Sequence, residues 1–256
     1  MYGSAFSGVP LAAELHDAST WEWWHFLSFG GVVVGGLEFL NHGVLSLFEG
    51  VEKRIPIRGK HLDEFETIDK AFINFNKLAI IVFSYHILRF SIVSTGIVWD
   101  ALSFGIMNGP VALALMHIVY DLFYTVFHRV LHYRLFYGYC HKHHHRQRAP
   151  TRGNLDAINV HPFEFVVGEY LHLVAAYLVS CYLVPVHIFS LGWFIIVGGI
   201  LASLNHTRYD LSFFGVYDVK VHDVHHRLPE SNYGQYIMLW DWLMGSYKPY
   251  TQRIKE

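Results

Sequence analysis

The chain has 256 residues, of which 53% are apolar and only 16% are charged, whereas soluble globular chains carry about 25% charged residues. Its 19 Lys and Arg and 21 Asp and Glu give a net charge of −2, which excludes the broad basic surface of a nucleic-acid-binding protein. Two cysteines, Cys140 and Cys181, are too few for a disulfide framework or a thiolate zinc site. Histidine is abundant, with 19 residues, as many as Lys and Arg together.

Membrane spans are predicted where Lys and Arg are rare and apolar residues continue for the roughly 20 positions that a bilayer requires. In chain order we expect five spans, within residues 23–48, 78–98, 111–127, 165–184 and 187–204. The last two form a hairpin that turns at Pro185, because proline ends helices. Lys77 and Arg89 flank or interrupt the second span, so four spans with one interfacial segment remain an alternative.

The connecting segments differ in charge. Residues 51–70, 128–152 and 207–256 are rich in Lys and Arg, which places them in the cytosol by the positive-inside rule, whereas the N-terminus and residues 99–110 contain neither. We therefore expect an all-α integral membrane bundle of four or five helices with a cytosolic helical cap. No repeat, low-complexity tract or linker divides the chain, so residues 1–256 are predicted to form one domain.

The cap segments contain closely spaced histidines at positions that share one face of a helix, namely i, i+3 and i+4. These are the pair His128 and His132, the triad His141, His144 and His145, and the triad His222, His225 and His226. We expect each triad to direct three rings at one point. With His206 the candidate ligands number nine, which is too many for one four-coordinate ion and fits two ions with four or five nitrogens each. Neutral imidazole suits Fe, Zn, Cu and Ni, so the metal stays open.

Other histidines are expected to be structural. His143 lies inside the first triad but points away from it at i+2, so it is left out of the ligand set. Isolated histidines in apolar runs are usually hydrogen-bonded core or interfacial residues. This interpretation covers His16, His25, His42, His61, His86, His117, His172 and His187.

The three histidine motifs resemble the histidine boxes of the membrane fatty acid hydroxylase/sterol desaturase superfamily. The resemblance covers residues 111–250 and includes further matching positions: Asp121, Tyr124, Pro150, His161-Pro-Phe-Glu164, Asn205-His206, Asn232-Tyr233-Gly234 and Trp240-Asp241-x-Leu243-x-Gly245. It implies a di-iron, O2-dependent enzyme of the endoplasmic reticulum membrane with its histidine cap in the cytosol. It adds His161 to the candidate metal ligands. Zinc is the expected substitute for iron in a purified preparation.

Carboxylates usually orient metal-binding imidazoles from outside the ligand shell. The candidates for this role are Asp121, Glu164 and Asp223, of which Asp121 lies two helical turns before His128. Ordinary interfacial polar residues are the equally weighted alternative.

The resemblance also implies electrons from NAD(P)H through a reductase and cytochrome b5. No His-Pro-Gly-Gly haem motif occurs in the chain, so a partner is expected to supply these electrons. The basic residues between Arg129 and Arg152 are suited to an acidic electron donor and also to lipid headgroups, and the lipid interpretation is slightly favoured.

The substrate is the least determined part of the interpretation. The stretch from His206 to Asp210 resembles that of sterol C-4 methyl oxidases and cholesterol hydroxylases, except that Arg208 replaces a glycine. The His161-Pro-Phe-Glu stretch is similar to that of sphingoid-base hydroxylases. The leading hypothesis is a hydroxylase of a sterol or long-chain lipid. The alternatives are a lipid desaturase with the same site and a non-catalytic membrane protein whose cap is held together by zinc.

Overall fold

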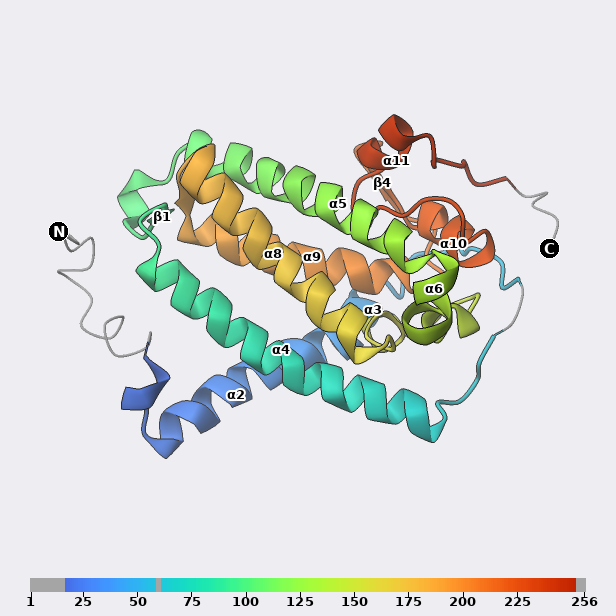
Figure 1. Cartoon of the computed structure of the whole chain (residues 1–256), viewed down its shortest axis with the longest axis horizontal. Helices are drawn as coiled ribbons and strands as arrows, with labels where there is room; N and C mark the ends of the chain where they lie inside the picture. Colours follow the sequence, from blue (N-terminus) through green and yellow to red (C-terminus); the bar gives the residue numbers. More distant parts are fainter. Residues whose placement is uncertain (1–16, 59–60, 252–256) are drawn as a thin grey trace.

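The computed structural model describes residues 17–58 and 61–251 (Figure 1). The expected outside N-terminus, the cap residue Lys60 and the last five positions of the predicted single domain lie beyond those ranges. The fold is mostly helical, as predicted. Within the described ranges, five helical segments are long and apolar enough to cross a membrane, so the chain is a multi-pass membrane protein.

The five spans lie close to the predicted ranges. The first is α2 (Trp23–Glu38), which continues through η2 (Phe39–Gly43) into α3 (Val44–Leu47). The second is α4 (Thr67–Val93). The third is η4 (Met107–Val111) followed by α5 (Ala112–Leu131). The fourth and fifth are α8 (Pro162–Tyr182) and α9 (Ile188–Asn205), which form the expected hairpin around Pro185.

The second span differs most from its prediction, because α4 begins eleven residues before position 78. Its start is fixed by a capping box in which the Glu66 backbone N–H donates to the Asp69 carboxylate at 2.8 Å. Lys77 does not end the span, because its ammonium lies 3.3 Å from the Glu38 carboxylate on α2. A charge that is paired with a charge on a neighbouring helix is tolerated within a membrane-spanning bundle.

Helices α5, α8 and α9 pack around the main apolar core, which includes the fully buried Met116, Ala175, Val179 and Phe194. At the end of the bundle far from the histidines, β1 (Ile97–Val98) pairs in parallel with β2 (Val186–His187), close to the turn η3 (Ala101–Ser103). Large apolar side chains face outward on the spans, and Val32 on α2 is 76% exposed. An outward apolar surface is the arrangement that suits surrounding lipid.

Short elements form a cap at the other end, where α5 and α9 end and α8 begins (Figure 1). They are α6 (Arg134–Phe136), η5 (Tyr137–His141), η6 (His144–Arg146), α7 (Asn154–Ala157), β3 (Ser212–Phe213), β4 (Tyr217–Asp218), α10 (Val219–Arg227) and α11 (Leu239–Met244). A further turn, η1 (Ala18–Thr20), precedes α2. The histidine motifs are therefore gathered at one end of the bundle.

Candidate metal centre

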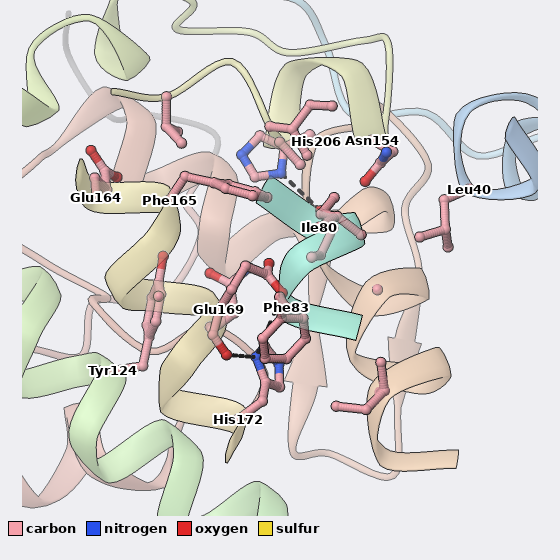
Figure 2. Close-up of a pocket in the computed structure, with 18 of the residues that line it drawn as sticks. Leu40, Ile80, Phe83, Tyr124, Asn154, Glu164, Phe165, Glu169, His172 and His206 are labelled. Carbon is pink, nitrogen blue, oxygen red and sulfur yellow. Dashed lines mark hydrogen bonds and ion pairs between the residues drawn. The ribbon is translucent and has the colours of Figure 1, made fainter. Parts of the chain in front are cut away.

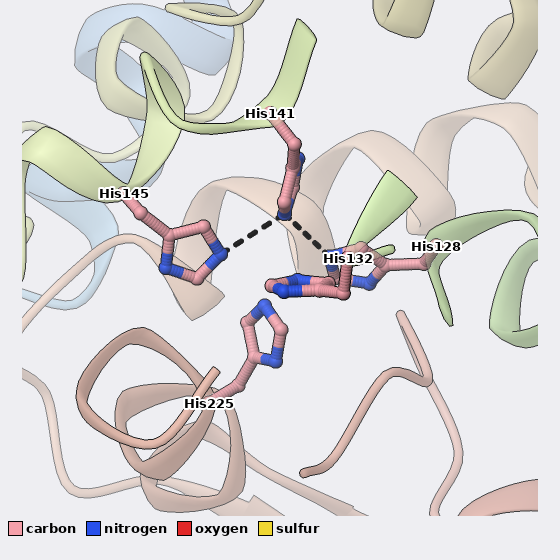
Figure 3. A group of neighbouring side chains, drawn as sticks. All are labelled: His128, His132, His141, His145 and His225. Carbon is pink, nitrogen blue, oxygen red and sulfur yellow. Dashed lines mark hydrogen bonds between the residues drawn. The ribbon is translucent and has the colours of Figure 1, made fainter. Parts of the chain in front are cut away.

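Nine of the ten candidate ligands lie in two groups within the described ranges. In each group, ligand atoms from different side chains lie within 4.8 Å of one another. The larger group contains His128, His132, His141, His145 and His225 (Figure 3). The smaller group contains His144, His206, His222 and His226.

The expectation that each triad directs its three rings at one point is wrong, because both triads are divided between the groups. His141 and His145 belong to the larger group, whereas His144 belongs to the smaller one. His222 and His226 belong to the smaller group, whereas His225 belongs to the larger one. In each triad the i and i+4 side chains stay together and the i+3 side chain joins the other group. On a helix, i+3 and i+4 are about 100° apart around the axis, which allows them to face neighbouring points.

Hydrogen bonds determine which ring nitrogens are free in the larger group. The Nδ1 of His128 lies 2.8 Å from the Tyr233 carbonyl, and the Nδ1 of His225 lies 2.7 Å from the Ser231 carbonyl. The Nδ1 of His141 lies 2.7 Å from the Glu164 carboxylate. Since these oxygens accept hydrogen bonds, each Nδ1 carries the proton and each Nε2 of the neutral ring has a free lone pair.

These lone pairs face one another at short distances. The Nε2 of His141 is 2.9 Å from the Nε2 of both His128 and His145. The buried Nε2 atoms of His132 and His225 have no hydrogen-bond partner. Two unprotonated nitrogens cannot hydrogen-bond to each other, so the close contact between His128 and His141 is suited to a cation bound between the rings.

The smaller group likewise brings imidazole nitrogens of different side chains close together. The Nδ1 of His206 donates to the Ala202 carbonyl at 2.8 Å, which leaves its Nε2 as a lone pair. That Nε2 lies 3.2 Å from the Nε2 atoms of His144 and His222, and His226 continues the chain of contacts at 3.2 Å from His222. The four rings are buried, and the Nδ1 atoms of His222 and His226 have no partner.

The rings are suited to metal because they remain neutral. Burial, and after it the neighbouring imidazoles, holds the pKa of His141, His145 and His226 well below its usual value. Burial lowers the pKa of His132 to about 3. A metal ion binds the unprotonated ring, so a low pKa removes competition from protons near neutral pH. The residues therefore fit two cations held by nitrogen alone.

Of the three candidate orienting carboxylates, Glu164 contacts a histidine. The Asp121 carboxylate instead accepts from the backbone N–H groups of Gln235, Tyr236 and Ile237. Asp223 forms ion pairs with Arg208 at 2.6 Å and Arg227 at 2.8 Å. Both carboxylates differ from the expectation because their hydrogen bonds and ion pairs are made with backbone N–H groups and guanidinium groups instead of imidazoles.

The loop 231–237 supports the larger group with backbone groups that the sequence did not reveal. Its Ser231 and Tyr233 carbonyls orient His225 and His128, as described above. Asp241 holds this loop by accepting from the N–H groups of Tyr233 and Gly234, both at 2.8 Å. Asp241 was noted in the sequence as part of a family motif but was given no role. The orienting carbonyls could not be predicted, because every residue has a backbone carbonyl.

His161 lies outside both groups. It caps the start of α8, where its Nδ1 accepts from the Phe163 N–H at 3.2 Å, and its ring packs edge-on against Phe72. His143 also lies outside, with its Nε2 2.9 Å from Asn159 and from Asp69. The prediction left His143 out of the ligand set and included His161, and the structure places neither of them in a group.

A cavity of about 160 Å³ connects the smaller group with the interior of the bundle (Figure 2). At the cap end it is lined by His144, His206 and His222. From there it continues between α4, α5, α8 and α9, past apolar side chains such as Ile80 and Phe165. A ligand in this cavity would lie inside the membrane-spanning part of the protein and still reach the histidines.

The model of the fatty acid hydroxylase family matches residues 113–246, which is 134 of the 256 residues. The chain belongs to the fatty acid hydroxylase family. All nine grouped histidines fall within the matched range. Searches of curated proteins and of solved structures find no match.

Membership in the fatty acid hydroxylase family implies an oxidoreductase, and the family's use of iron suits the two histidine groups. The departure at Arg208 has a structural explanation. Its guanidinium bonds the Ile55 and Pro56 carbonyls in addition to Asp223, and so ties α10 to the segment after α3. A glycine could make none of these bonds.

Proposed function

We propose that this protein is a di-iron, O2-dependent membrane oxygenase that hydroxylates an unactivated C–H bond of a sterol or long-chain lipid. The observation that supports this most strongly is the convergence of imidazole nitrogens from the cap segments into groups of five and four. The family match adds the chemistry that such groups serve.

The two groups would hold one iron ion each. When bound, the iron pair supplies the redox chemistry needed to activate O2, which no side chain can supply. The protein's own residues fix the rings: Glu164 and the carbonyls of Ser231, Tyr233 and Ala202 hold four imidazoles in one tautomer. These groups keep the lone pairs directed inward before any ion arrives.

The cavity would position the lipid. Its walls between the cap and the bilayer interior are largely apolar, so an alkyl or ring segment replaces water beside His144, His206 and His222. Holding a C–H bond next to the histidines removes most of the translational freedom that a reaction in solution would have to overcome.

We further propose that the protein lies in the endoplasmic reticulum membrane with its cap on the cytosolic side, because the segments that form the cap are the basic ones. Electrons would come from NAD(P)H through a reductase and cytochrome b5. The basic residues between Arg129 and Arg152 offer this donor a surface, of which Arg146 already pairs with Glu66.

The test combines metal analysis with lipid analysis. Purified protein should bind two iron ions per chain and consume O2 with its lipid, and His144→Ala should lose an ion and all turnover. Lipid profiles of cells lacking the protein should accumulate a precursor one oxygen atom lighter than the missing product. A precursor two hydrogens heavier would indicate a desaturase instead. Two zinc ions, no iron on reconstitution and no O2 consumption would refute the oxygenase and support the zinc-stabilised cap.

A further inference from the structure

The cavity that begins at the smaller histidine group ends at a second polar cluster inside the bundle. Figure 2 shows His206 at one end of this cavity and Glu169 and His172 at the other. Tyr236 also lines that inner end. The side chains between the two ends are mostly apolar: Leu37, Leu40, Ile80, Phe83, Phe165 and Ile195. The lining is therefore polar at both ends and apolar in the middle.

The carboxyl group of Glu169 has no hydrogen-bond partner among the described residues. The nearest ring nitrogen, His172 Nδ1, is 4.0 Å from the carboxylate oxygen, which is too long for a hydrogen bond. Glu169 is the eighth residue of a 21-residue span, and α8 packs closely against α4 and α5. Its side chain is nevertheless 28% exposed, and it lines the cavity.

A carboxyl group without a partner is costly at this depth in a membrane. An unpaired polar group in an apolar environment is unfavourable because it gives up its hydrogen bonds to water. Ionisable residues inside spans therefore usually mark a ligand or ion path. Glu169 lines the cavity and forms no hydrogen bond within the described part of the protein, so a ligand in the cavity can supply its partner.

The neighbouring Tyr236 and His172 define what kind of group fits. His172 Nδ1 donates to the Glu169 backbone carbonyl at 3.1 Å, so its Nε2 is the acceptor of the Tyr236 hydroxyl proton at 3.1 Å. Tyr120 stacks on His172 with ring centroids 4.0 Å apart and keeps this ring in place. With its proton committed, the Tyr236 oxygen can only accept a hydrogen bond from a ligand.

The absence of a side chain at Gly198 makes room for this arrangement. A Cβ at this position would lie 2.9 Å from the Tyr236 hydroxyl oxygen and 3.3 Å from His172 Nε2. Any larger residue would therefore displace the hydroxyl from His172. The position of the Tyr236 oxygen thus depends on three helices, since Tyr120, His172 and Gly198 come from α5, α8 and α9.

We propose that the inner end of the cavity binds the hydroxyl group of a lipid alcohol, between the Glu169 carboxyl and the Tyr236 oxygen. A hydroxyl both donates and accepts, so it can donate its one proton to the Tyr236 oxygen while it accepts from the protonated carboxyl of Glu169. A ketone, ester or ether cannot donate to Tyr236. This inference rests on the proposed function, because it places the carbon to be oxidised at the other end, beside His144, His206 and His222.

The length of α8 gives the approximate spacing of the two positions on the ligand. Glu164, which lines the cavity together with His144, His206 and His222, lies five residues before Glu169 and eight before His172. At 1.5 Å per residue these intervals are about 8 and 12 Å along the helix axis. The ligand is therefore a lipid whose hydroxyl lies about 8–12 Å from the oxidised carbon, with an apolar segment between them.

The test is equilibrium binding to purified holoprotein in lipid nanodiscs, with empty nanodiscs as the background. One arm compares cholesterol with its 3-deoxy and 3-keto counterparts, and the second arm compares hexadecanol with hexadecane. In at least one arm the alcohol should bind about tenfold or more tightly than the analogues that cannot donate, because each lost hydrogen bond leaves a buried polar group unpaired. The arm that shows the difference identifies a ring or a chain alcohol. Equal binding of alcohols and analogues in both arms would overturn the proposal.

Variants localise the effect. Glu169→Leu and Tyr236→Phe should reduce the preference for the alcohol to about twofold or less, and the near-isosteric Glu169→Gln should retain part of it. Tyr170→Phe is the matched control, because Tyr170 is next to Glu169 but its hydroxyl bonds His86 away from the cavity. An unchanged preference for the alcohol in Glu169→Leu and Tyr236→Phe would contradict the proposed hydroxyl-binding site.

Metal content distinguishes failure of the proposed oxygenase function from failure of the proposed hydroxyl-binding site. Neither Glu169 nor Tyr236 contacts a grouped histidine, so the variants should keep both ions. If the protein prefers alcohols but binds no iron, the proposed oxygenase function is refuted and the hydroxyl-binding site still stands. If it binds iron and oxidises lipid without preferring alcohols, only the hydroxyl-binding site is refuted.

Discussion

Replacing Glu164 should release metal from one histidine group and leave the other loaded. The Glu164 carboxylate accepts from His141 Nδ1 at 2.7 Å, and the Nε2 of the same ring contacts two other rings of the larger group. A hydrogen bond to a charged group contributes about 1.5–3 kcal/mol, which corresponds to a factor of about 10–150 in affinity. Loss of an outer carboxylate partner typically costs 10–100-fold in metal affinity. Glu164→Leu should therefore weaken the larger group's affinity by about 10–100-fold.

The assay is metal content per chain after dialysis against a graded series of competing chelator. The wild type should retain two ions over a range in which Glu164→Leu retains one, since no contact joins Glu164 to the smaller group. Glu164→Gln keeps an acceptor oxygen and should lose less than about tenfold. Glu169→Leu, on the same helix but without a contact to either histidine group, should behave like the wild type. Simultaneous loss of both ions, or retention of both at every chelator concentration, would refute this reasoning.

Three further predictions concern the assignment, protonation and support of the rings. His225→Ala and His226→Ala are adjacent substitutions that should each remove a different ion, the first from the group of five and the second from the group of four; loss of the same ion in both would contradict the grouping. Metal-free protein should lose thermal stability as the pH falls from about 7 to about 5. Burial depresses the pKa of rings such as His222, so below about pH 6.5 the unfolded chain binds protons that the folded chain does not. A Tm that stays constant over this pH range would argue against buried neutral rings. Asp121→Ala should destabilise the protein by about 1–3 kcal/mol for each of the backbone N–H groups it leaves unpaired at Gln235–Ile237, which a denaturation curve in detergent would measure and an unchanged midpoint would disprove.

Much of the fold follows from the distribution of charge and apolar residues. The spans could be located because a bilayer requires long apolar runs, and Pro185 marked the turn of the last hairpin. The early start of α4 could not be seen, since its first turns are polar and depend on the Glu66 capping box. The pairing of Lys77 with Glu38 joins two helices far apart in sequence, so one helix alone could not reveal it.

The site shows a similar division. Helical spacing identified eight of the nine histidines that the structure groups, and His206 was added to them, but it assumed that i, i+3 and i+4 serve one point. In the structure, His144 and His225 each leave the other two rings of their triad and join the second group, because the two groups of rings lie side by side. Residues 141–146 are also not one regular α-helix, since η5 ends at His141 and η6 begins at His144. The carbonyls that orient His128 and His225 belong to a loop whose path depends on Asp121 and Asp241, and only a folded chain defines that path.

The most direct test of the central claim is X-ray absorption at the iron edge of the reconstituted protein, together with the iron content of the same sample. Nine histidines over two ions predict two irons per chain and an average first shell that includes four to five imidazole nitrogens and no sulfur. A single iron per chain, a shell with fewer than three imidazoles, or a sulfur contribution would contradict the two-ion histidine centre.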